Sequence, residues 1–276
     1  MGLIPAMRFG ICNEIFDGWS IDDTFEFCAK TGYDAVEIAP FTIAPYVTDI
    51  SADERKRIRA AADKHSIAIS GLHWVLVKAE GMHLTDPDDK TREKTAQYLV
   101  DLVDCAADLG GNTIVVGSPK QRDLQEGVSF EQGWQWATDC FRRSVMRGEE
   151  RGVTVCFEPL APSETNFINT AEQAIEFVDQ LHSPSFKIIL DCKAMSSESK
   201  PIPQVIKESW PNFAYFHAND ENLKGPGFGN TDFKAIGAAL REVGYKGVVS
   251  VEVFNFEEGP EVIATRSLEH LRENVA

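Results

Sequence analysis

The stretch GVTVCFEPLA, residues 152–161, runs three β-branched residues into a cysteine and a phenylalanine and then reaches Glu158. β-Branched and aromatic residues favour strands, so this stretch predicts a buried strand that finishes on a carboxylate. An unpaired carboxylate beside a core is costly, and it must either reach solvent at the strand tip or be held by a cation. The choice between the two depends on whether the pattern recurs elsewhere in the chain.

Similar β-rich runs lie at regular intervals along the sequence. They cover residues 7–15, 35–40, 67–74, 113–119, 153–160, 186–192, 213–219 and 247–254, and segments with helical apolar spacing separate them. Several helical segments end in glycine just before the next run, as helix C-caps do, at Gly32, Gly110–Gly111, Gly152 and Gly244. Eight strand–helix units in a chain of this length predict an α/β fold of the (β/α)8 TIM barrel type.

Signals for other architectures are missing. A doubly wound sheet is the main competing fold, but the segment ICNEIFDGWS, residues 11–20, lacks the GxGxxG phosphate loop that usually follows its first strand. The Pro/Ser-rich piece SSESKPIPQ, residues 196–204, is short and is interpreted as a loop rather than a linker. We therefore expect residues 1–276 to form a single barrel domain.

Composition limits the partners and the location of the protein. Its 43 acidic and 27 basic residues give a net charge of −16, which disfavours nucleic acid as a partner. No stretch approaches the roughly 18 apolar residues of a membrane span, and the start MGLIPAMRFG does not resemble a signal peptide. We expect a cytoplasmic protein without membrane contact, whose six scattered cysteines are buried free thiols.

Polar residues stand at the ends of the last four β-rich runs. They are Glu158, Asp191, His217 and Glu252, one on each of four adjacent predicted strands. Because the strands of a barrel are parallel, these side chains should gather at its carboxyl-terminal mouth, where active sites of this fold lie. Three bare carboxylates would repel one another, and a divalent cation removes that repulsion. The oxygen-rich set without a thiolate favours Mn²⁺ or Mg²⁺, with Co²⁺ also compatible, over structural Zn²⁺.

The sequence resembles the xylose-isomerase-like barrels known as sugar phosphate isomerases/epimerases, and within them the ketose 3-epimerases. The similar segments cover nearly the whole chain and include DAVEIAP (34–40), FEPLAPSETNFINTAEQA (157–174), ILDCKAM (189–195) and VSVEVF (249–254). The resemblance implies that Glu158, Asp191, His217 and Glu252 bind the metal and that the two glutamates also act as acid and base. Two family positions differ, because Ala194 and Leu223 replace a substrate-binding His and Arg, whereas Glu164 matches a family Glu.

These observations predict a divalent-metal-dependent isomerase or epimerase of a sugar or keto sugar. A metal chelated by a carbonyl and a hydroxyl oxygen stabilises the enediolate that forms when the α-proton leaves. Glu158 and Glu252 would remove and return the proton on opposite faces of the carbon. Further candidates for substrate contact are Glu37, His73, Glu164, Lys193, Asn219 and Trp19, and Trp74 is a candidate for the apolar wall.

Other functions stay open at this point. A metal-dependent lyase or dehydratase would use the same carbanion and expel a β-substituent from a keto-sugar derivative. A metal-dependent endonuclease is disfavoured, because such an enzyme needs more His ligands and a basic surface. A sugar-binding barrel without catalysis would show no measurable metal affinity. Pairing of the outer helices into a homo-oligomer is also left open, as are the sugar, its phosphorylation and the reacting carbon.

Overall fold

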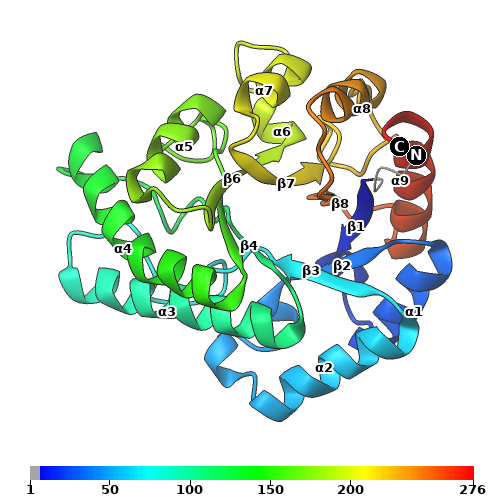
Figure 1. Ribbon diagram of the computed structural model, residues 1–276, viewed down its shortest axis with the longest axis horizontal. Coiled ribbons are helices and arrows are strands. Elements are labelled where there is room, and N and C mark those ends of the chain that lie inside the picture. Colours follow the sequence, from blue (N-terminus) through cyan, green and yellow to red (C-terminus); the bar gives the residue numbers. More distant parts are fainter. Residues whose placement is uncertain (1–6) are drawn as a thin grey trace.

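A computed structural model describes residues 7–276, whose eight parallel strands close into a barrel in chain order (Figure 1). The strands are β1 (Arg8–Cys12), β2 (Ala35–Ile38), β3 (Ala68–Leu72), β4 (Thr113–Val116), β5 (Thr154–Phe157), β6 (Phe186–Asp191), β7 (Phe213–Ala218) and β8 (Val248–Val251). The barrel closes where β8 pairs with β1, with Arg8 opposite Val248. The predicted (β/α)8 barrel is confirmed. Residues 1–6, part of the start inspected for a signal peptide, lie outside the described residues.

Helices surround the strands in the outer layer of the barrel (Figure 1). The α-helices are α1 (Ile21–Thr31), α2 (Ala52–His65), α3 (Asp89–Leu109), α4 (Phe130–Arg151), α5 (Ala171–Val178), α6 (Cys192–Met195), α7 (Ile202–Ser209), α8 (Phe233–Glu242) and α9 (Pro260–Asn274). Short 3-10 helices are η1 (Asn13–Phe16), η2 (Pro40–Thr42), η3 (Val47–Asp49) and η4 (Asp179–Leu181). As predicted, Gly32, Gly110 and Gly152 cap their helices in the left-handed conformation, which glycine adopts without steric cost.

One segment differs from its predicted structure. Residues 196–204 were expected to form a loop, but helix α7 begins at Ile202 and therefore includes the last three of them. Pro201 occupies the N-cap of this helix, where its fixed φ and missing N–H are tolerated. A Pro/Ser-rich piece thus contains a helix start as well as a loop.

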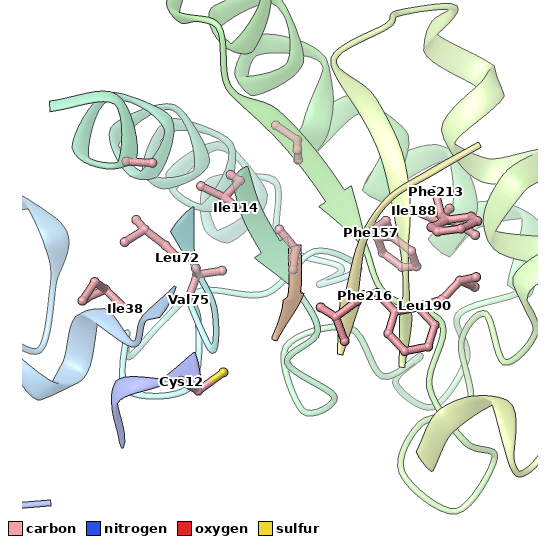
Figure 2. Close-up of a cluster of buried hydrophobic side chains, with 14 of the residues drawn as sticks. Cys12, Ile38, Leu72, Val75, Ile114, Phe157, Ile188, Leu190, Phe213 and Phe216 are labelled. Atoms are coloured by element: carbon pink, nitrogen blue, oxygen red, sulfur yellow. The ribbon is translucent and has the colours of Figure 1, made fainter. Parts of the chain in front are cut away.

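Alternation along the strands separates two apolar layers. In β6, Ile188 and Leu190 belong to the large core between strands and helices, whereas Ile189 belongs to a smaller cluster with Cys156 and Tyr215. Because successive side chains of a strand point to opposite faces, this smaller cluster fills the barrel interior. Figure 2 shows part of the large core, including Phe157 of β5. The interior cluster forms the floor beneath the mouth of the barrel.

Two further sequence predictions can be compared with the structure. All six cysteines are free and buried, as expected from their scattered spacing. Among residues 7–276, no helix has the length and apolar character needed to cross a membrane.

Candidate active site

Glu158, Asp191, His217 and Glu252 meet at the carboxyl-terminal mouth of the barrel. One ligand atom from each lies within 4.8 Å of those of the other three, and all four residues are buried. Asp191 and His217 lie near the ends of β6 and β7, while Glu158 and Glu252 directly follow β5 and β8. Each stands two residues after an inward-facing position, so strand alternation directs all four into the mouth. The convergence expected from the sequence is therefore present in the structure.

Two of the three carboxylates of this cluster, those of Glu158 and Asp191, lie where a negative charge is unfavourable. Burial and the neighbouring carboxylates of Glu252 and Asp191 raise the pKa of Glu158 to about 8. Burial and Glu252 likewise raise the pKa of Asp191 to about 6. Both shifts show that the protein alone does not fully compensate the negative charge. A divalent cation would compensate it, and the oxygen-rich donor set fits such an ion.

His217 is held between two glutamates. Its Nε2 lies 3.0 Å from Oε2 of Glu37, and its Nδ1 lies 3.1 Å from Oε2 of Glu252. Although burial disfavours the charged ring, Glu252 and Glu37 raise the pKa of His217 well above its ordinary value. Within residues 7–276, Nδ1 of His217 and Oε2 of Glu252 make no hydrogen bond despite their proximity. These two buried atoms are suited to share a cation, which provides a second indication of a metal site.

Neighbouring groups fix the orientation of Glu252 and Asp191. Trp74 donates its indole N–H to Oε1 of Glu252 at 2.7 Å. Asp191 accepts hydrogen bonds from the amide of Asn219 at 2.5 Å and from the backbone N–H of Ala194 at 2.8 Å. These contacts leave each carboxylate with a defined direction, because a hydrogen-bonded side chain loses most of its rotamer freedom.

A buried arginine supports the segment that carries Glu158. The guanidinium of Arg122 donates to the backbone oxygens of Glu158 at 2.5 Å and Val116 at 2.7 Å. It lies 4.3 Å from the centre of the Phe157 ring and is completely buried. Arg122 therefore joins the ends of β4 and β5 through two charge-assisted hydrogen bonds. The sequence analysis missed this residue, because an arginine in a loop carries no signal of burial.

A cavity of about 420 Å³ opens beside the cluster and includes Glu158, Asp191 and Glu252 in its lining. Two of the predicted substrate residues, Glu164 and Lys193, also line it. The ammonium of Lys193 lies 2.6 Å from Oε1 of Glu164 and 4.2 Å from the ring centre of Phe254. We will call this space the catalytic cavity. In its polar wall, the Lys193 ammonium is a hydrogen-bond donor and the Glu164 carboxylate an acceptor, and both suit sugar hydroxyl groups.

The remaining predicted substrate residues occupy other positions near the mouth. Glu37 and His73 are completely buried behind the cluster, and Nε2 of His73 lies 2.8 Å from Oε2 of Glu14. Although burial disfavours its charged form, Glu14 and Glu37 raise the pKa of His73 to about 9. Asn219 is also completely buried, with its amide oxygen accepting from the backbone N–H of Lys193 at 2.8 Å. These three side chains therefore contact other protein groups around the metal ligands, and direct substrate contact by them stays a prediction.

Trp19 lies in a neighbouring cavity rather than in the catalytic one. Its ring packs edge-on against Phe16 and Phe27. The sequence analysis also missed Glu14, which is buried and lines that same neighbouring cavity. The signal that identified the other carboxylates was present there too, because Glu14 follows the end of β1 closely.

The two positions that differ from the ketose 3-epimerase pattern offer no side-chain polar group. Ala194 is buried in α6, and only its backbone N–H contacts Asp191. Leu223 is 40% exposed and lines neither cavity of the mouth. Among the cationic residues that line the catalytic cavity, Lys193 lies nearest to Asp191 in the sequence. The structure therefore offers no side-chain hydrogen bond at either of these two positions.

Comparison with known proteins assigns the family. Residues 25–274 match the model of the xylose isomerase-like TIM barrel, and the chain belongs to this family. A relative named D-psicose 3-epimerase, from Ruminiclostridium cellulolyticum, is 28% identical over 240 residues, which cover 86% of this chain and 80% of the relative.

Solved structures agree with the fold. D-psicose 3-epimerase from Clostridium cellulolyticum H10, solved with D-tagatose, superimposes with a TM-score of 0.85 at 24% identity, covering 98% of this chain and 99% of that one. A 3-keto-D-glucoside 4-epimerase from E. coli superimposes with a TM-score of 0.84 at 21% identity, covering 97% and 99% of the two chains. At these identities the likeness shows the barrel architecture.

Proposed function

We propose that this protein is a divalent-metal-dependent epimerase of keto sugars, with Glu158, Asp191, His217 and Glu252 as metal ligands. The observation that carries the proposal is the convergence of these four buried side chains beside the catalytic cavity. The relatives named as 3-epimerases of psicose, ribulose and other ketoses support the reaction class. Mn²⁺ or Mg²⁺, with Co²⁺ also compatible, suits the donor set.

The two glutamates are the proposed acid and base. When bound between these four side chains, the metal would supply Lewis-acid stabilisation of the negative charge that develops on the sugar oxygens. Glu158 and Glu252 project from β5 and β8, on different sides of the cluster, so each can address a different face of the sugar carbon. One carboxylate takes the proton from its face, and the other, in its protonated form, returns a proton to the opposite face. This exchange inverts the centre.

The surrounding residues prepare the two glutamates for unlike roles. The pKa of Glu158 is raised to about 8 by burial and neighbouring carboxylates, which suits a group that carries a proton near neutral pH. Burial opposes ionisation of Glu252, yet His217 lowers its pKa, and Trp74 donates a hydrogen bond to its carboxylate. In the protein without metal, Glu252 is therefore ionised and suited to act as the base, whereas Glu158 holds a proton near neutral pH and is suited to act as the acid. A bound cation would lower both pKa values.

The substrate should differ from the free ketoses named for the relatives. Ala194 and Leu223 provide no side-chain hydrogen bonds, whereas the Lys193–Glu164 ion pair faces the catalytic cavity. Lys78 and Lys120 also line this cavity. The ammonium groups can donate to hydroxyl or carbonyl oxygens of a sugar.

The test is a panel of keto sugars incubated with the Mn²⁺-loaded protein in D₂O. We expect deuterium to enter one carbon next to the carbonyl of a recovered sugar, together with its epimer, and formation of the epimer to be lost with Glu158→Gln. Absence of exchange in every keto sugar would contradict the proposal. The lyase alternative predicts a product that has lost a β-substituent, which mass spectrometry separates from an epimer.

A further inference from the structure

The mouth of the barrel contains a second cavity of about 760 Å³ beside the catalytic one. Its lining comes from the segments that follow β1, β2, β3 and β8, and the two cavities share Trp74, Val77 and Lys78. Each cavity alone lies in the size range of sites for small ligands. A single small sugar at the metal cluster would therefore leave this second cavity empty.

We propose that the second cavity binds a second sugar ring joined to the reacting keto sugar, so that the substrate is a disaccharide-sized glycoside. This inference rests on the proposed function for the catalytic cavity and narrows its substrate class. Two features of the second cavity support it independently: an aromatic lining and a buried carboxylate without sufficient partners.

The aromatic lining suits the apolar face of a sugar ring. Phe16, Trp19, Phe41, Trp74 and Phe256 all contribute to the second cavity. Phe256 is 42% exposed, although a large apolar side chain gains stability from burial. Aromatic rings present a flat apolar surface on which the C–H face of a sugar can pack, while hydroxyl groups at its edge reach polar partners. A ligand ring against Phe256 would bury this surface.

Glu14 supplies the polar partner. It is only 7% exposed, it lines the second cavity, and its Oε2 faces His73 at 2.8 Å. Within the described residues, Oε1 of Glu14 is buried and has no hydrogen-bond donor. A buried carboxylate oxygen without a donor is unfavourable, and a small turn of the Glu14 side chain toward the cavity that it lines would let a sugar hydroxyl satisfy it. The second cavity thus combines an aromatic wall with an unmet requirement for a hydrogen-bond donor.

Trp74 forms the boundary over which such a substrate would pass. Its ring lies 6.0 Å from Phe41, which lines the second cavity, and 6.1 Å from Phe254, which lines the catalytic cavity. Its N–H is fixed on Glu252 at 2.7 Å, so the boundary is attached directly to a proposed acid–base residue. Trp74 also adopts φ +50°, a left-handed conformation that is strained for an aromatic residue. A ligand occupying both cavities would have its linkage beside this ring.

The test compares D-fructose with isomaltulose, a fructose that carries a glucosyl ring on O6, and with lactulose, which carries a galactosyl ring on O4. We expect the Mn²⁺-loaded protein to exchange deuterium into the fructosyl unit of at least one disaccharide with a higher kcat/KM than into free D-fructose. Phe256→Ala should lower the ratio of these two kcat/KM values roughly two- to tenfold. Met146→Ala, which changes an exposed side chain on α4, should leave the ratio unchanged.

A binding measurement separates this inference from the proposed function. Saturation-transfer NMR of both disaccharides with the metal-free protein should show contact at the glucosyl or galactosyl protons, weakened in Phe256→Ala but not in Met146→Ala. If the disaccharides bind in this way but no keto sugar exchanges deuterium, the epimerase proposal is wrong and the second site stands. If D-fructose exchanges as well as the disaccharides and Phe256→Ala does not change the ratio, the second site is wrong and the epimerase proposal stands.

Discussion

Glu37 accepts a hydrogen bond from Nε2 of His217 at 3.0 Å, and this contact directs the opposite ring nitrogen toward the metal cluster. Because a neutral imidazole carries its proton on one nitrogen, an acceptor at Nε2 favours the tautomer whose Nδ1 lone pair is free. Glu37 belongs to β2 and His217 to β7, so the contact crosses the barrel interior. Glu37 on β2 thus controls the tautomer of His217, a proposed metal ligand on β7.

Removing this contact should weaken metal binding. Glu37→Ala leaves His217 without its acceptor, and we expect Mn²⁺ affinity to fall roughly 10- to 100-fold, as for other partners of metal-binding histidines. Glu37→Gln keeps an oxygen acceptor of the same size and should lose less affinity than Glu37→Ala. Isothermal titration calorimetry measures both. Equal affinities for wild type and Glu37→Ala, in a protein with an unchanged circular dichroism spectrum, would show that Glu37 does not orient His217.

Gly117 should be essential for the position of Glu158. A Cβ at this glycine would overlap the Glu158 carboxylate, so Gly117→Ala must displace it from the cluster. We expect turnover to fall roughly 10²–10⁴-fold, the usual contribution of an acid–base group, with little change in the melting temperature. The control places Gly117→Ala in a Glu158→Ala background, where the clash is absent. Gly117→Ala should then have no further effect, and a full additive loss would mean that it acts elsewhere.

The sequence predicted the parts of this site that follow from strand geometry. Asp191, His217 and Glu252 could be placed together because parallel strands bring their carboxyl ends to one mouth, whatever the loops do. Glu158 was found in the same way, even though β5 ends one residue earlier, at Phe157. To predict which residues at the strand ends meet, only the order and direction of the strands must be known.

Contacts that depend on loop paths could not be predicted. Trp19 follows β1, but η1 and the turn after it carry its ring into the second cavity. Arg122 lies in the loop after β4, and its burial depends on how that loop folds back over Phe157. Contact of Asn219 with substrate stays a prediction, and the sequence did not indicate the hydrogen bonds of its amide with Asp191 and Lys193. For Arg122 and Asn219 the decisive contact is made with a residue distant in sequence.

Metal affinity should rise with pH between about 6 and 8. Burial and neighbouring carboxylates raise the pKa of Asp191 to about 6 and that of Glu158 to about 8 in the protein without metal. Below these pH values the two groups hold protons that a cation must displace, so binding releases protons and weakens as pH falls. Above about 8 both carboxylates are ionised and the dependence should become weaker, with only the proton of His217 left for a cation to displace, because Glu252 and Glu37 raise the pKa of that ring well above its ordinary value although burial opposes this.

Calorimetry in buffers of different ionisation enthalpy measures the number of protons released on Mn²⁺ binding. We expect fewer protons to be released above pH 9 than at pH 7, because Asp191 and Glu158 are then ionised and the pKa of His217, raised well above its ordinary value, leaves only that ring to lose a proton. The same shifts imply that the folded metal-free protein holds these protons more tightly than the unfolded chain does. Its stability should therefore decrease as pH rises from about 4, through 6, to 8. An affinity that is independent of pH across this range would contradict the assignment of both carboxylates as ligands.

The last prediction separates proton transfer from metal binding at Glu252. Glu252→Gln keeps an oxygen that can ligate the metal and accept the hydrogen bond from Trp74, but it loses the carboxylate that moves a proton. Metal should therefore remain bound, more weakly, while turnover falls roughly 10²–10⁴-fold. The variant should still exchange a substrate proton with D₂O from the face that Glu158 addresses, without completing inversion. Trp74→Phe is the matched control, since it removes the hydrogen bond and leaves the carboxylate, and it should retain inversion at a reduced rate. A Glu252→Gln protein that keeps its metal and near-normal turnover would show that Glu252 only holds the ion, and the two-base mechanism would have to be abandoned.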